Sequence, residues 1–463
     1  MAMSAPSENR GEWESKFGFI MAAAGSAVGL GNIWRFPYIT GQNGGGAFVL
    51  VYLACVILIG VPLLFTEMGF GRMTKKSTIG AFKDTGANIF FKGFGAVLAL
   101  LVSFFVLSYY GVIAGWTIGY IGKSITGATG SFAEFSSNPM NTIPLMGVFT
   151  LVTIFIVTKG ISGGIEKAAK VLMPALFILI FVVAIRSLTL DGAMAGVDFY
   201  LNPDFSKIKA GTILAALGQA FFSMSIGWGI MITYGSYLPK SSNIVSSGVW
   251  VGFMDAGVAL LAGFMIFPAV FAFGKSPEAG ATLVFEVLPE VFSGMPGGPV
   301  IGALFFLLLT VAALTSSISM LEVPASYFVD EKKWSRKKSA WVVGALVFIF
   351  GVPSALSSVD GNFFANMSFP TFDGDAQGWF NIIDYWFGTF FIVIVALVTC
   401  IYVAWAMPIS KIENEIHQGA PNWPPGSFAS KAFVVFIKYI CPIVIALVLL
   451  NMMGVLGVFA GGG

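Results

Sequence analysis

Residues 25–39 read GSAVGLGNIWRFPYI and lie inside the first long apolar block of the chain. This short stretch contains three glycines, an asparagine, an arginine and a proline. A glycine inside a helix costs about 1 kcal/mol relative to alanine, and an unpaired backbone group in hydrocarbon costs several more, so a break persists only where other groups satisfy the freed backbone. The stretch therefore predicts a membrane helix that is discontinuous around Ser26 to Gly31.

The composition is that of an integral membrane protein. Of the 463 residues, 57% are hydrophobic and 10% are charged, and the mean hydropathy is +0.86. Apolar blocks run for roughly 20 residues or more, the length at which a helix crosses ~30 Å of hydrocarbon, whereas a membrane β-barrel shows short alternating segments. We therefore predict an all-α membrane protein. The net charge of +2 is too small to indicate nucleic-acid binding. The cysteines Cys55, Cys400 and Cys441 lie in apolar blocks and are interpreted as packing residues.

Hydropathy predicts eleven transmembrane helices. The first fifteen residues are polar, lack the apolar core of a signal peptide, and are predicted to be a cytoplasmic segment, residues 1–15. The predicted spans are residues 16–40, 44–71, 91–124, 141–158, 165–186, 209–237, 242–274, 299–329, 339–358, 380–409 and 431–459.

Charge in the loops orients these spans. Basic residues gather in the loops after spans 2, 4 and 8, which the positive-inside rule places in the cytoplasm. The opposite loops collect acidic residues. The sequence therefore predicts a multi-pass protein of the cell (plasma) membrane with a cytoplasmic N-terminus and an extracellular C-terminus. The basic residues are Arg72, Lys75, Lys76, Lys83, Lys159, Lys167, Lys170, Lys332, Lys333, Arg336, Lys337 and Lys338; the acidic ones are Asp191, Asp198, Asp204, Glu278, Glu286, Glu290, Asp360, Asp373 and Asp375.

Span 6 contains a second interruption, FFSMSIGWG at residues 221–229. Spans 1 and 6 are the first members of two five-span sets, residues 16–190 and 191–411, and an odd-numbered set starts its second copy from the opposite side of the membrane. The sequence thus predicts a 5+5 inverted repeat, followed by a cytoplasmic loop and span 11 in residues 412–463. Paired discontinuous helices in inverted repeats indicate a transporter's central site, where half-helix N-termini face an anion and unwound carbonyls face a cation. A carboxylate-bearing substrate beside a sodium ion suits both.

Five motifs make the chain resemble the neurotransmitter:sodium symporter family, in particular its bacterial amino-acid transporters of the leucine-transporter type. They are AGSAVGLGNIWRFPY, NGGGAF, SYYGVIAGW, LGQAFFSMSIGWGIMITYGSY and LTSSISM, in family order. The resemblance runs from Arg10 to about residue 411. It is strongest to eleven-span bacterial members that take several hydrophobic amino acids, whereas most of the family has twelve spans.

The resemblance implies two sodium sites. The first is formed by the Ala27 carbonyl, Asn32, Ser223 and Asp255, with the substrate carboxylate. The second is formed by the carbonyls of Gly25, Val28 and Ala312 with the hydroxyls of Thr315 and Ser316. All these ligands are hard oxygen donors, which a hard cation prefers. Capping a carbonyl of the preceding turn is the alternative role of such hydroxyls.

Asp255 stands where relatives often have asparagine and where chloride-dependent members place a chloride nearby. A fixed carboxylate supplies the negative charge that buried cations need. We therefore expect transport that requires no chloride.

The resemblance also implies the substrate. Monoamine transporters carry an aspartate at the position of Gly29, and its absence leaves room for the substrate's own carboxylate. Leu30 and Gly31 amides and the Tyr110 hydroxyl would hold that carboxylate, while carbonyls around Ala27, Phe222 and Ser225 would take the ammonium group. The predicted side-chain pocket is mostly apolar and contains adaptable methionines, which favours aliphatic and aromatic L-amino acids. It comprises Val106, Phe222, Met224, Trp228, Ser316 and Met320. Ser223, beside Phe222, is also assigned to the substrate site.

Charged residues within spans are predicted to form gates. Family matching pairs Arg35 with Asp384 outside, with Phe222 and Tyr110 as a lid, and Arg10 with Asp330 inside, near Trp13 and Tyr237. Static ion pairs are the alternative in both cases.

Two further elements are predicted to serve the return of the carrier. Gly164 and Pro174 are predicted to let span 5 unwind and admit water to the second sodium. The membrane acids Glu67 and Glu322 are interpreted as structural hydrogen-bonding groups or as proton exchangers.

Other functional classes fit the sequence less well. A channel would need a continuous polar pore, an enzyme would need a nucleophile or metal cluster, and the single histidine, His417, is in a loop. A non-transporting amino-acid sensor, or a transporter of another small carboxylate-bearing solute, stays open as an alternative.

Overall fold

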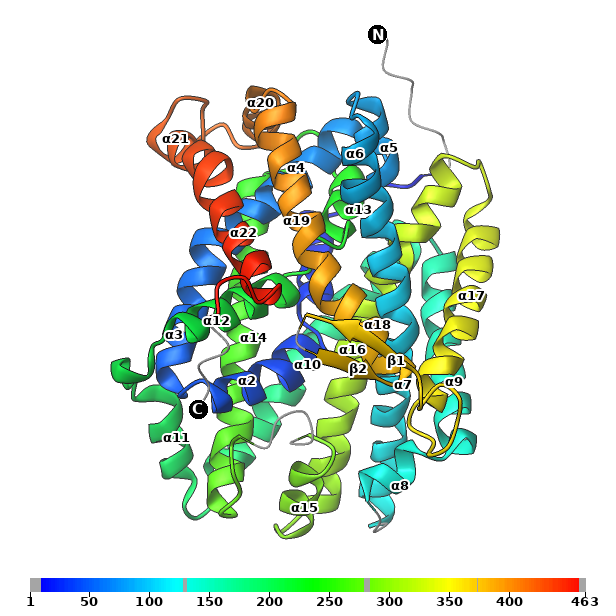
Figure 1. The fold of residues 1–463 in the computed structure, drawn as a ribbon, viewed down its shortest axis with the longest axis vertical. Coiled ribbons are helices and arrows are strands. Elements are labelled where there is room, and N and C mark those ends of the chain that lie inside the picture. Colours follow the sequence, from blue (N-terminus) through cyan, green and yellow to red (C-terminus); the bar gives the residue numbers. More distant parts are fainter. Residues whose placement is uncertain (1–9, 128–130, 279–283, 373, 458–463) are drawn as a thin grey trace.

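A computed structural model describes residues 10–127, 131–278, 284–372 and 374–457. Outside the described residues lie residues 1–9 of the predicted cytoplasmic segment, Asp373, and residues 458–459 at the end of the predicted eleventh span. The described chain is an elongated bundle of helices whose long axis is vertical in Figure 1.

Nine helices in the described ranges are long and apolar enough to cross a membrane. They often join α-helical and π-helical segments without a break. Their bounds are Gly46–Thr74 (α3, η2, α4), Ile89–Thr126 (α6, η3, α7), Pro139–Thr158 (α9), Ile161–Leu188 (η4, α10), Ile244–Ala272 (α14), Gly298–Asp330 (α16), Arg336–Leu356 (α17), Trp379–Ala406 (α18, η7, α19, η8) and Phe428–Met452 (α21, η9, α22).

The two remaining apolar segments are broken. The first consists of α1, Lys16–Ala27, followed by the π-helical η1, Gly31–Arg35, and α2, Phe36–Gln42, with a bend of 48° at the break. The second consists of α12, Ala210–Ser223, and α13, Ile230–Ser236, separated by six residues without helix. Both discontinuities lie in the two segments that the sequence predicts. Every predicted span overlaps one of these elements, whereas the total of eleven spans and the inverted repeat stay predictions.

Short elements cover the two ends of the bundle and one side of it. In Figure 1, α5 and α20 lie at the top of the bundle, and α8 and α15 lie at the bottom. We call the first of these the Arg10 end. The short elements are α5, Thr78–Asp84; α8, Phe132–Ser136; α11, Ala193–Leu201; the 3-10 turn η5, Phe205–Lys207; α15, Val287–Ser293; and α20, Ser410–Gly419.

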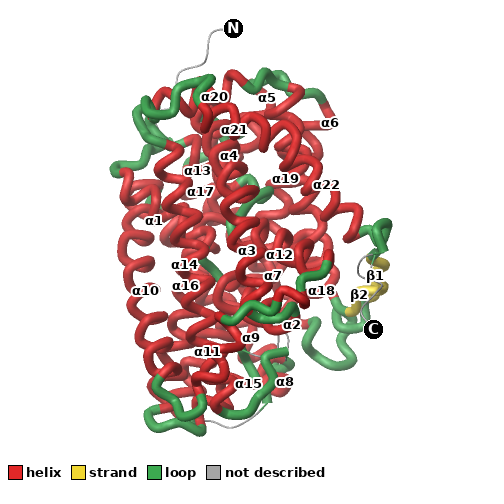
Figure 2. Tube along the Cα trace, turned by 90° about the vertical axis from the view of Figure 1, so that its left-hand side faces the viewer, coloured by secondary structure: helices red, strands yellow, loops and turns green. Residues whose placement is uncertain are grey.

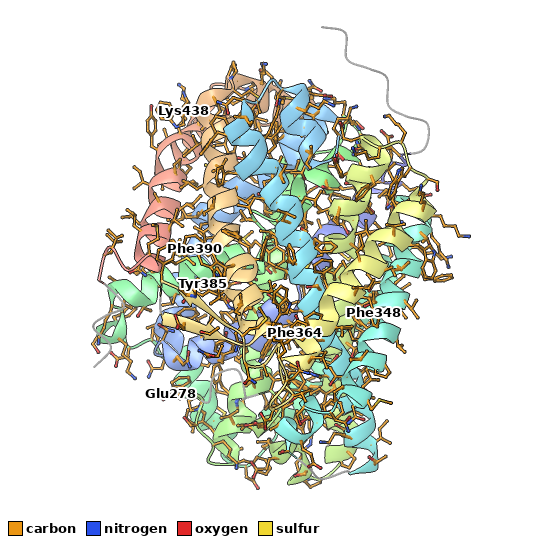
Figure 3. The ribbon with its side chains drawn as sticks, turned by 45° about the vertical axis from the view of Figure 1, so that its right-hand side comes forward. Glu278, Phe348, Phe364, Tyr385, Phe390 and Lys438 are labelled. Atoms are coloured by element: carbon orange, nitrogen blue, oxygen red, sulfur yellow. The ribbon has the colours of Figure 1, made fainter. Side chains whose placement is uncertain are left out.

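The expectation of an all-α chain missed one element, an antiparallel hairpin of β1, Ser368–Thr371, and β2, Gly374–Gln377. It lies at the side of the bundle in Figure 2. The hairpin adjoins the helix that carries Tyr385 and Phe390, both labelled in Figure 3: the Tyr385 hydroxyl accepts the Phe372 amide at 3.1 Å, and the Phe372 and Phe390 rings are 5.1 Å apart. Two four-residue strands carry too weak a hydropathy signal to be found among eleven apolar blocks.

The helices α7 and α16 form the most extensive helix pair and line the centre of the bundle. Helix α16 also contacts α1, α10 and α13, and α4 packs along α13. The broken segments are therefore enclosed by continuous helices. This enclosure is the condition under which non-helical backbone is tolerated at membrane depth.

Candidate functional site

The break after α1 redirects backbone amides to side chains. The Gly29 amide donates to Asn32 Oδ1 at 3.2 Å and the Leu30 amide donates to the Tyr110 hydroxyl at 3.3 Å. In an uninterrupted helix these amides would donate to the carbonyls of Gly25 and Ser26. Those carbonyls are therefore released from the helical ladder and can accept other groups.

The backbone groups freed by the break between α12 and α13 are also hydrogen-bonded to side chains. The Gly227 amide donates to Glu67 Oε1 at 2.9 Å, Ser103 Oγ donates to the Trp228 carbonyl at 2.7 Å, and Thr78 Oγ1 donates to the Gly229 carbonyl at 2.9 Å. Ser225 has a φ of 54°, a left-handed backbone that is uncommon outside glycine. The side chain of Glu67 thus supports the broken span, as its structural interpretation expected.

The two breaks face one another. The Ser26 carbonyl accepts the Ser225 hydroxyl at 3.0 Å and the Ser316 hydroxyl at 3.2 Å. A Cβ on Gly29 would lie 2.4 Å from Ser316 Oγ and 3.1 Å from the Tyr110 hydroxyl oxygen. Only a glycine therefore fits at residue 29 between α7 and α16.

One cluster of buried oxygens surrounds Asp255, on α14. Ser223 Oγ donates to the two carboxylate oxygens at 2.7 and 2.9 Å, and Asn32 Nδ2 donates to Oδ1 at 2.8 Å. The Tyr52 hydroxyl donates to Asp255 Oδ2 at 3.2 Å. Asp255 and Asn32 are completely buried. The structure thus brings together the three side chains that the sequence assigns to the first sodium site, and their hard oxygens suit a small cation.

A second group of oxygens lies where α1 meets α16. Thr315 Oγ1 donates to the Ala312 carbonyl at 2.9 Å and Ser316 Oγ donates to the same carbonyl at 3.3 Å. A Cβ on Gly25 would lie 3.1 Å from Thr315 Cβ, so the two helices are in close contact there. Val28 follows α1 in an extended conformation. Both hydroxyls thus donate to a carbonyl of the preceding turn of α16, and both residues lie beside the C-terminal end of α1.

A small central cavity of about 20 Å³ lies between the two breaks. It is bounded on one side by the unwound backbone and on the other by aromatic and apolar side chains. This volume holds about one water molecule, so an amino acid enters only if the aromatic side chains shift. The lining residues are Ser26, Ala27, Gly29, Gly31, Tyr110, Phe222, Ser225, Trp228, Ile230, Ser316 and Met320.

Four residues that the sequence assigns to the substrate site do not line this cavity. Ser223 belongs to the Asp255 cluster, Leu30 lines a second cavity, and Val106 is buried one turn before Tyr110. The Met224 sulfur lies 2.1 Å from where a Cβ on Gly60 would be. Met224 does not line the cavity in this structure, because α12 ends just before it and the side chain packs against span 2, so its place in the substrate pocket stays a prediction.

The second cavity has a volume of about 270 Å³ and adjoins the first. Tyr110 and Phe222 line both cavities, so these two rings form the wall between them. We call this space the outer cavity. Its lining residues are Leu30, Trp34, Arg35, Tyr38, Tyr109, Tyr110, Ile113, Phe222, Phe380, Asp384 and Thr389.

Arg35 and Asp384 line the outer cavity without forming the expected ion pair. The Arg35 guanidinium carbon lies 4.7 Å from the Phe222 ring centroid, and Nη1 donates to Gln219 Oε1 at 3.3 Å. Asp384 lies beside Tyr109, since a Cβ on Gly388 would be 2.7 Å from Asp384 Oδ1 and 2.3 Å from the Tyr109 hydroxyl oxygen. The ion pairs found in the described ranges do not include Arg35 with Asp384. The expected ion pair is therefore not formed in this conformation, and the gating role of the two residues stays a prediction.

At the Arg10 end of the bundle, an ion pair and several hydrogen bonds close the space between the helices. Arg10 Nε lies 2.6 Å from Asp330 Oδ1, Arg10 Nη2 donates to Ser236 Oγ at 3.0 Å, and the guanidinium carbon lies 4.8 Å from the Tyr237 ring centroid. Trp13 Nε1 donates to the Tyr234 carbonyl at 3.0 Å. All of these residues are buried. The structure thus brings together the residues predicted for the inner gate.

A second network closes the Arg10 end. Glu322 Oε1 accepts the Tyr237 hydroxyl at 2.6 Å, and Glu322 Oε2 is paired with Arg336, which donates to the Val157 carbonyl at 3.0 Å. Glu166 accepts the Glu14 amide at 2.8 Å and the Ser15 hydroxyl at 2.7 Å. These contacts tie the N-terminal segment to span 5.

Gly164 and Pro174 are both helical in this structure. Gly164 lies in the π-helical η4, Ile161–Glu166, and Pro174 lies inside α10, Lys167–Leu188. The unwinding of this stretch stays a prediction about another conformation.

Sequence reasoning missed several residues of the site. Tyr52 completes the Asp255 cluster, Gln219 donates to the Gly31 carbonyl at 2.8 Å, and Tyr109 lies beside Asp384 at Gly388. Gln219 could have been found as a buried amide in an apolar span, because such a group needs a partner. Tyr52 and Tyr109 carry no such signal, since tyrosine is common in membrane helices.

Two helix breaks, a buried carboxylate beside them, and a buried ion pair between Arg10 and Asp330 form a distinctive arrangement. The family model described as "Sodium:neurotransmitter symporter family" matches residues 10–142 and 129–456. The chain belongs to this family. Members of the family are sodium-coupled symporters, so this multi-pass membrane protein is a transporter and not an enzyme.

Similar proteins agree with this assignment over nearly the whole chain. An uncharacterized sodium-dependent transporter of Bacillus subtilis, YhdH, is 40% identical over 96% of this chain and 98% of its own length. Another from Haemophilus influenzae is 35% identical over 97% of this chain and 99% of its own. MhsT, known from a crystal structure in complex with L-phenylalanine, is 39% identical in sequence. The match covers 96% of this chain and 100% of the MhsT chain, with a TM-score of 0.86.

Proposed function

We propose that this symporter takes up hydrophobic L-amino acids, aliphatic and aromatic, by sodium-coupled alternating access. The central cavity carries this proposal. It joins the unwound backbone at Gly29, and Gly31 at the start of η1, to the aromatic walls of Phe222 and Trp228. Backbone donors and acceptors suit the charged ends of an amino acid, and the aromatic walls suit its apolar side chain.

The carboxylate end is assigned to the Gly29 side of the cavity. The Leu30 amide and the Tyr110 hydroxyl are 3.3 Å apart, and the Tyr110 hydroxyl lines the cavity. A substrate carboxylate would accept from both groups in place of their mutual hydrogen bond. The ammonium group is assigned to the carbonyls of Ala27, Phe222 and Ser225. MhsT was crystallised with L-phenylalanine, which supports an amino acid with a bulky apolar side chain.

Two sodium ions are proposed as the coupling ions. The donor set around Asp255 fits the first ion, since the buried carboxylate, the Ser223 hydroxyl and the Asn32 amide lie within hydrogen-bonding distance of one another. A cation would require the Asn32 amide to present Oδ1 where Nδ2 now donates. Gly25, Val28, Ala312, Thr315 and Ser316 are proposed to hold the second ion.

The gates are proposed to work in opposition. The closed Arg10 network and the outer cavity correspond to a carrier facing outward, and closure of Arg35 toward Asp384 over Phe222 would precede opening of the Arg10 end. We further propose eleven spans with a 5+5 inverted repeat, a cytoplasmic N-terminus and an extracellular C-terminus in the plasma membrane.

Uptake into vesicles with and without an inward sodium gradient tests the proposal. We expect purified protein in liposomes to concentrate labelled L-phenylalanine under an inward sodium gradient. Excess unlabelled leucine should compete, and glutamate and dopamine should not. Equilibration without accumulation would indicate a channel, binding without uptake would indicate a sensor, and competition only by a different carboxylate would indicate another substrate.

We expect Pro174→Ala to slow transport by about tenfold while equilibrium binding of substrate stays unchanged. A helix-interior proline costs about 3 kcal/mol, so its replacement stabilises the helical form of α10 and opposes the proposed unwinding. Single-turnover uptake compared with equilibrium binding separates the two quantities. Pro353→Ala, inside α17, is the matched control, and equal rates for Pro174→Ala and wild type would contradict unwinding at this stretch.

A further inference from the structure

A groove opens on the outside of the bundle at the Arg10 end, away from the transport site. It has a volume of about 280 Å³ and lies where the end of α9 and the beginning of η4 and α10 meet α16. Its walls include the apolar side chains of Ile156, Val171, Leu172 and Leu314, and its polar side chains are Lys159 and Lys167. We call it the Lys159 groove. A Cβ on Gly11 would lie 3.6 Å from Ile161 Cβ, which places this region beside Arg10.

The surroundings of the groove face hydrocarbon. Val171 is 65% exposed, and the neighbouring Phe155 and Ile178 are 58% and 64% exposed. Helix α10 runs along the left edge of the bundle in Figure 2. Large apolar side chains that are exposed along a membrane span contact lipid tails, so the apolar part of the groove continues a lipid-facing surface.

The polar part of the groove carries positive charge. Lys170 is paired with Glu166 at 2.7 Å, and Arg336 is paired with Glu322. The ion pairs in the described ranges include neither Lys159 nor Lys167. Lys159 Nζ lies 4.1 Å from the Phe155 ring centroid, which holds it at the lipid-facing side. An acyl-chain surface that ends in two lysines matches an anionic phospholipid.

We infer that the Lys159 groove binds one anionic phospholipid, with its phosphate at Lys159 and Lys167 and one acyl chain along Val171, Leu172 and Leu314. The neutral headgroup of a zwitterionic lipid would gain less from the two lysines. Basic pockets between membrane helices on the cytoplasmic side are suited to such headgroups. The inference places this end at the cytoplasm, as the proposed orientation does.

A lipid in this groove would influence transport. Gly163 and Gly164 line the groove within the stretch that is proposed to unwind, and Leu314 precedes the proposed sodium ligand Thr315. A chain packed along α10 stabilises its helical form, because unwinding would lose that contact. This consequence rests on the proposed function, whereas the binding site does not.

Native mass spectrometry with a phosphatidylglycerol titration tests the site directly. We expect Lys159→Gln with Lys167→Gln to weaken retention by about 25-fold, since each lysine near an anionic headgroup contributes about fivefold. The control is Lys431→Gln, an exposed lysine at the start of the span Phe428–Met452, which should bind as wild type. A phosphatidylglycerol with a diazirine on its acyl chain should crosslink within residues 156–172 or at Leu314.

Several results would overturn the inference: equal retention by wild type and the double variant, crosslinks confined to other spans, or equally tight binding of soluble glycerol phosphate, which would indicate a phosphate site without a chain. Thermal melting of the double variant checks that it is folded. In a separate arm, phosphatidylglycerol in place of phosphatidylcholine should change the uptake rate of wild type and not of the double variant. Retained lipid binding without any sodium-driven uptake would count against the proposed function and leave the lipid site standing.

Discussion

Replacing Gly29 by alanine is expected to abolish substrate binding, with a loss of about 100-fold or more in affinity. The added Cβ would lie 2.4 Å from Ser316 Oγ and 3.1 Å from the Tyr110 hydroxyl oxygen. Overpacking of this kind costs about 1–3 kcal/mol, and each 1.4 kcal/mol is about tenfold in affinity. The methyl group would also fill the space assigned to the substrate carboxylate.

Equilibrium binding of labelled L-phenylalanine in saturating sodium measures this effect. Gly218→Ala is the matched control, because it lies in α12 of the other broken segment and a Cβ there meets nothing within 4 Å. That variant should bind as wild type. A folded Gly29→Ala protein with wild-type affinity would show that the substrate does not use the cavity beside residue 29.

Replacing Asp255 by asparagine is expected to make transport depend on chloride. The carboxylate is completely buried and accepts from Ser223, Asn32 and Tyr52. It is the proposed counter-charge for the first sodium, and removing one member of a buried charge pair costs about 3–5 kcal/mol. In chloride-free medium, sodium-driven uptake should therefore fall by at least about 100-fold.

Addition of chloride should restore a measurable part of the uptake by Asp255→Asn and should not change uptake by wild type. The control is Asp198→Asn, an exposed acid on α11, which should transport normally with or without chloride. Chloride stimulation of the wild-type protein would contradict the proposal that Asp255 replaces the anion. Loss of uptake that chloride does not restore would assign the carboxylate to sodium coordination alone.

The inner and outer gates differ in how well a sequence predicts them. The residues of the inner pair, Arg10 and Asp330, come together at 2.6 Å. The outer residues, Arg35 and Asp384, occupy the same cavity without an ion pair. A family motif indicates which groups can meet, whereas the conformation decides which of them do meet.

The sequence by itself determined the membrane class, the positions of the spans and the two helix breaks. These features follow from local chemistry: hydrocarbon requires about 20 apolar residues per helix, and glycines with polar side chains within such a block mark the places where a helix stops. The charged loops likewise predicted an orientation without any tertiary information.

Only the tertiary structure decided which side chains satisfy the freed backbone and which line the cavities. Tyr52 and Gln219 enter the site from distant spans, and Glu166 binds the N-terminal segment at the Arg10 end. Met224 lies outside the central cavity and packs against Gly60. Such contacts depend on helix rotation and on the close approach of particular helix pairs, which hydropathy does not encode. The physical reason is that burial in a membrane bundle is set by packing and hydrogen bonding between helices, because the surrounding lipid is as apolar as the side chains themselves.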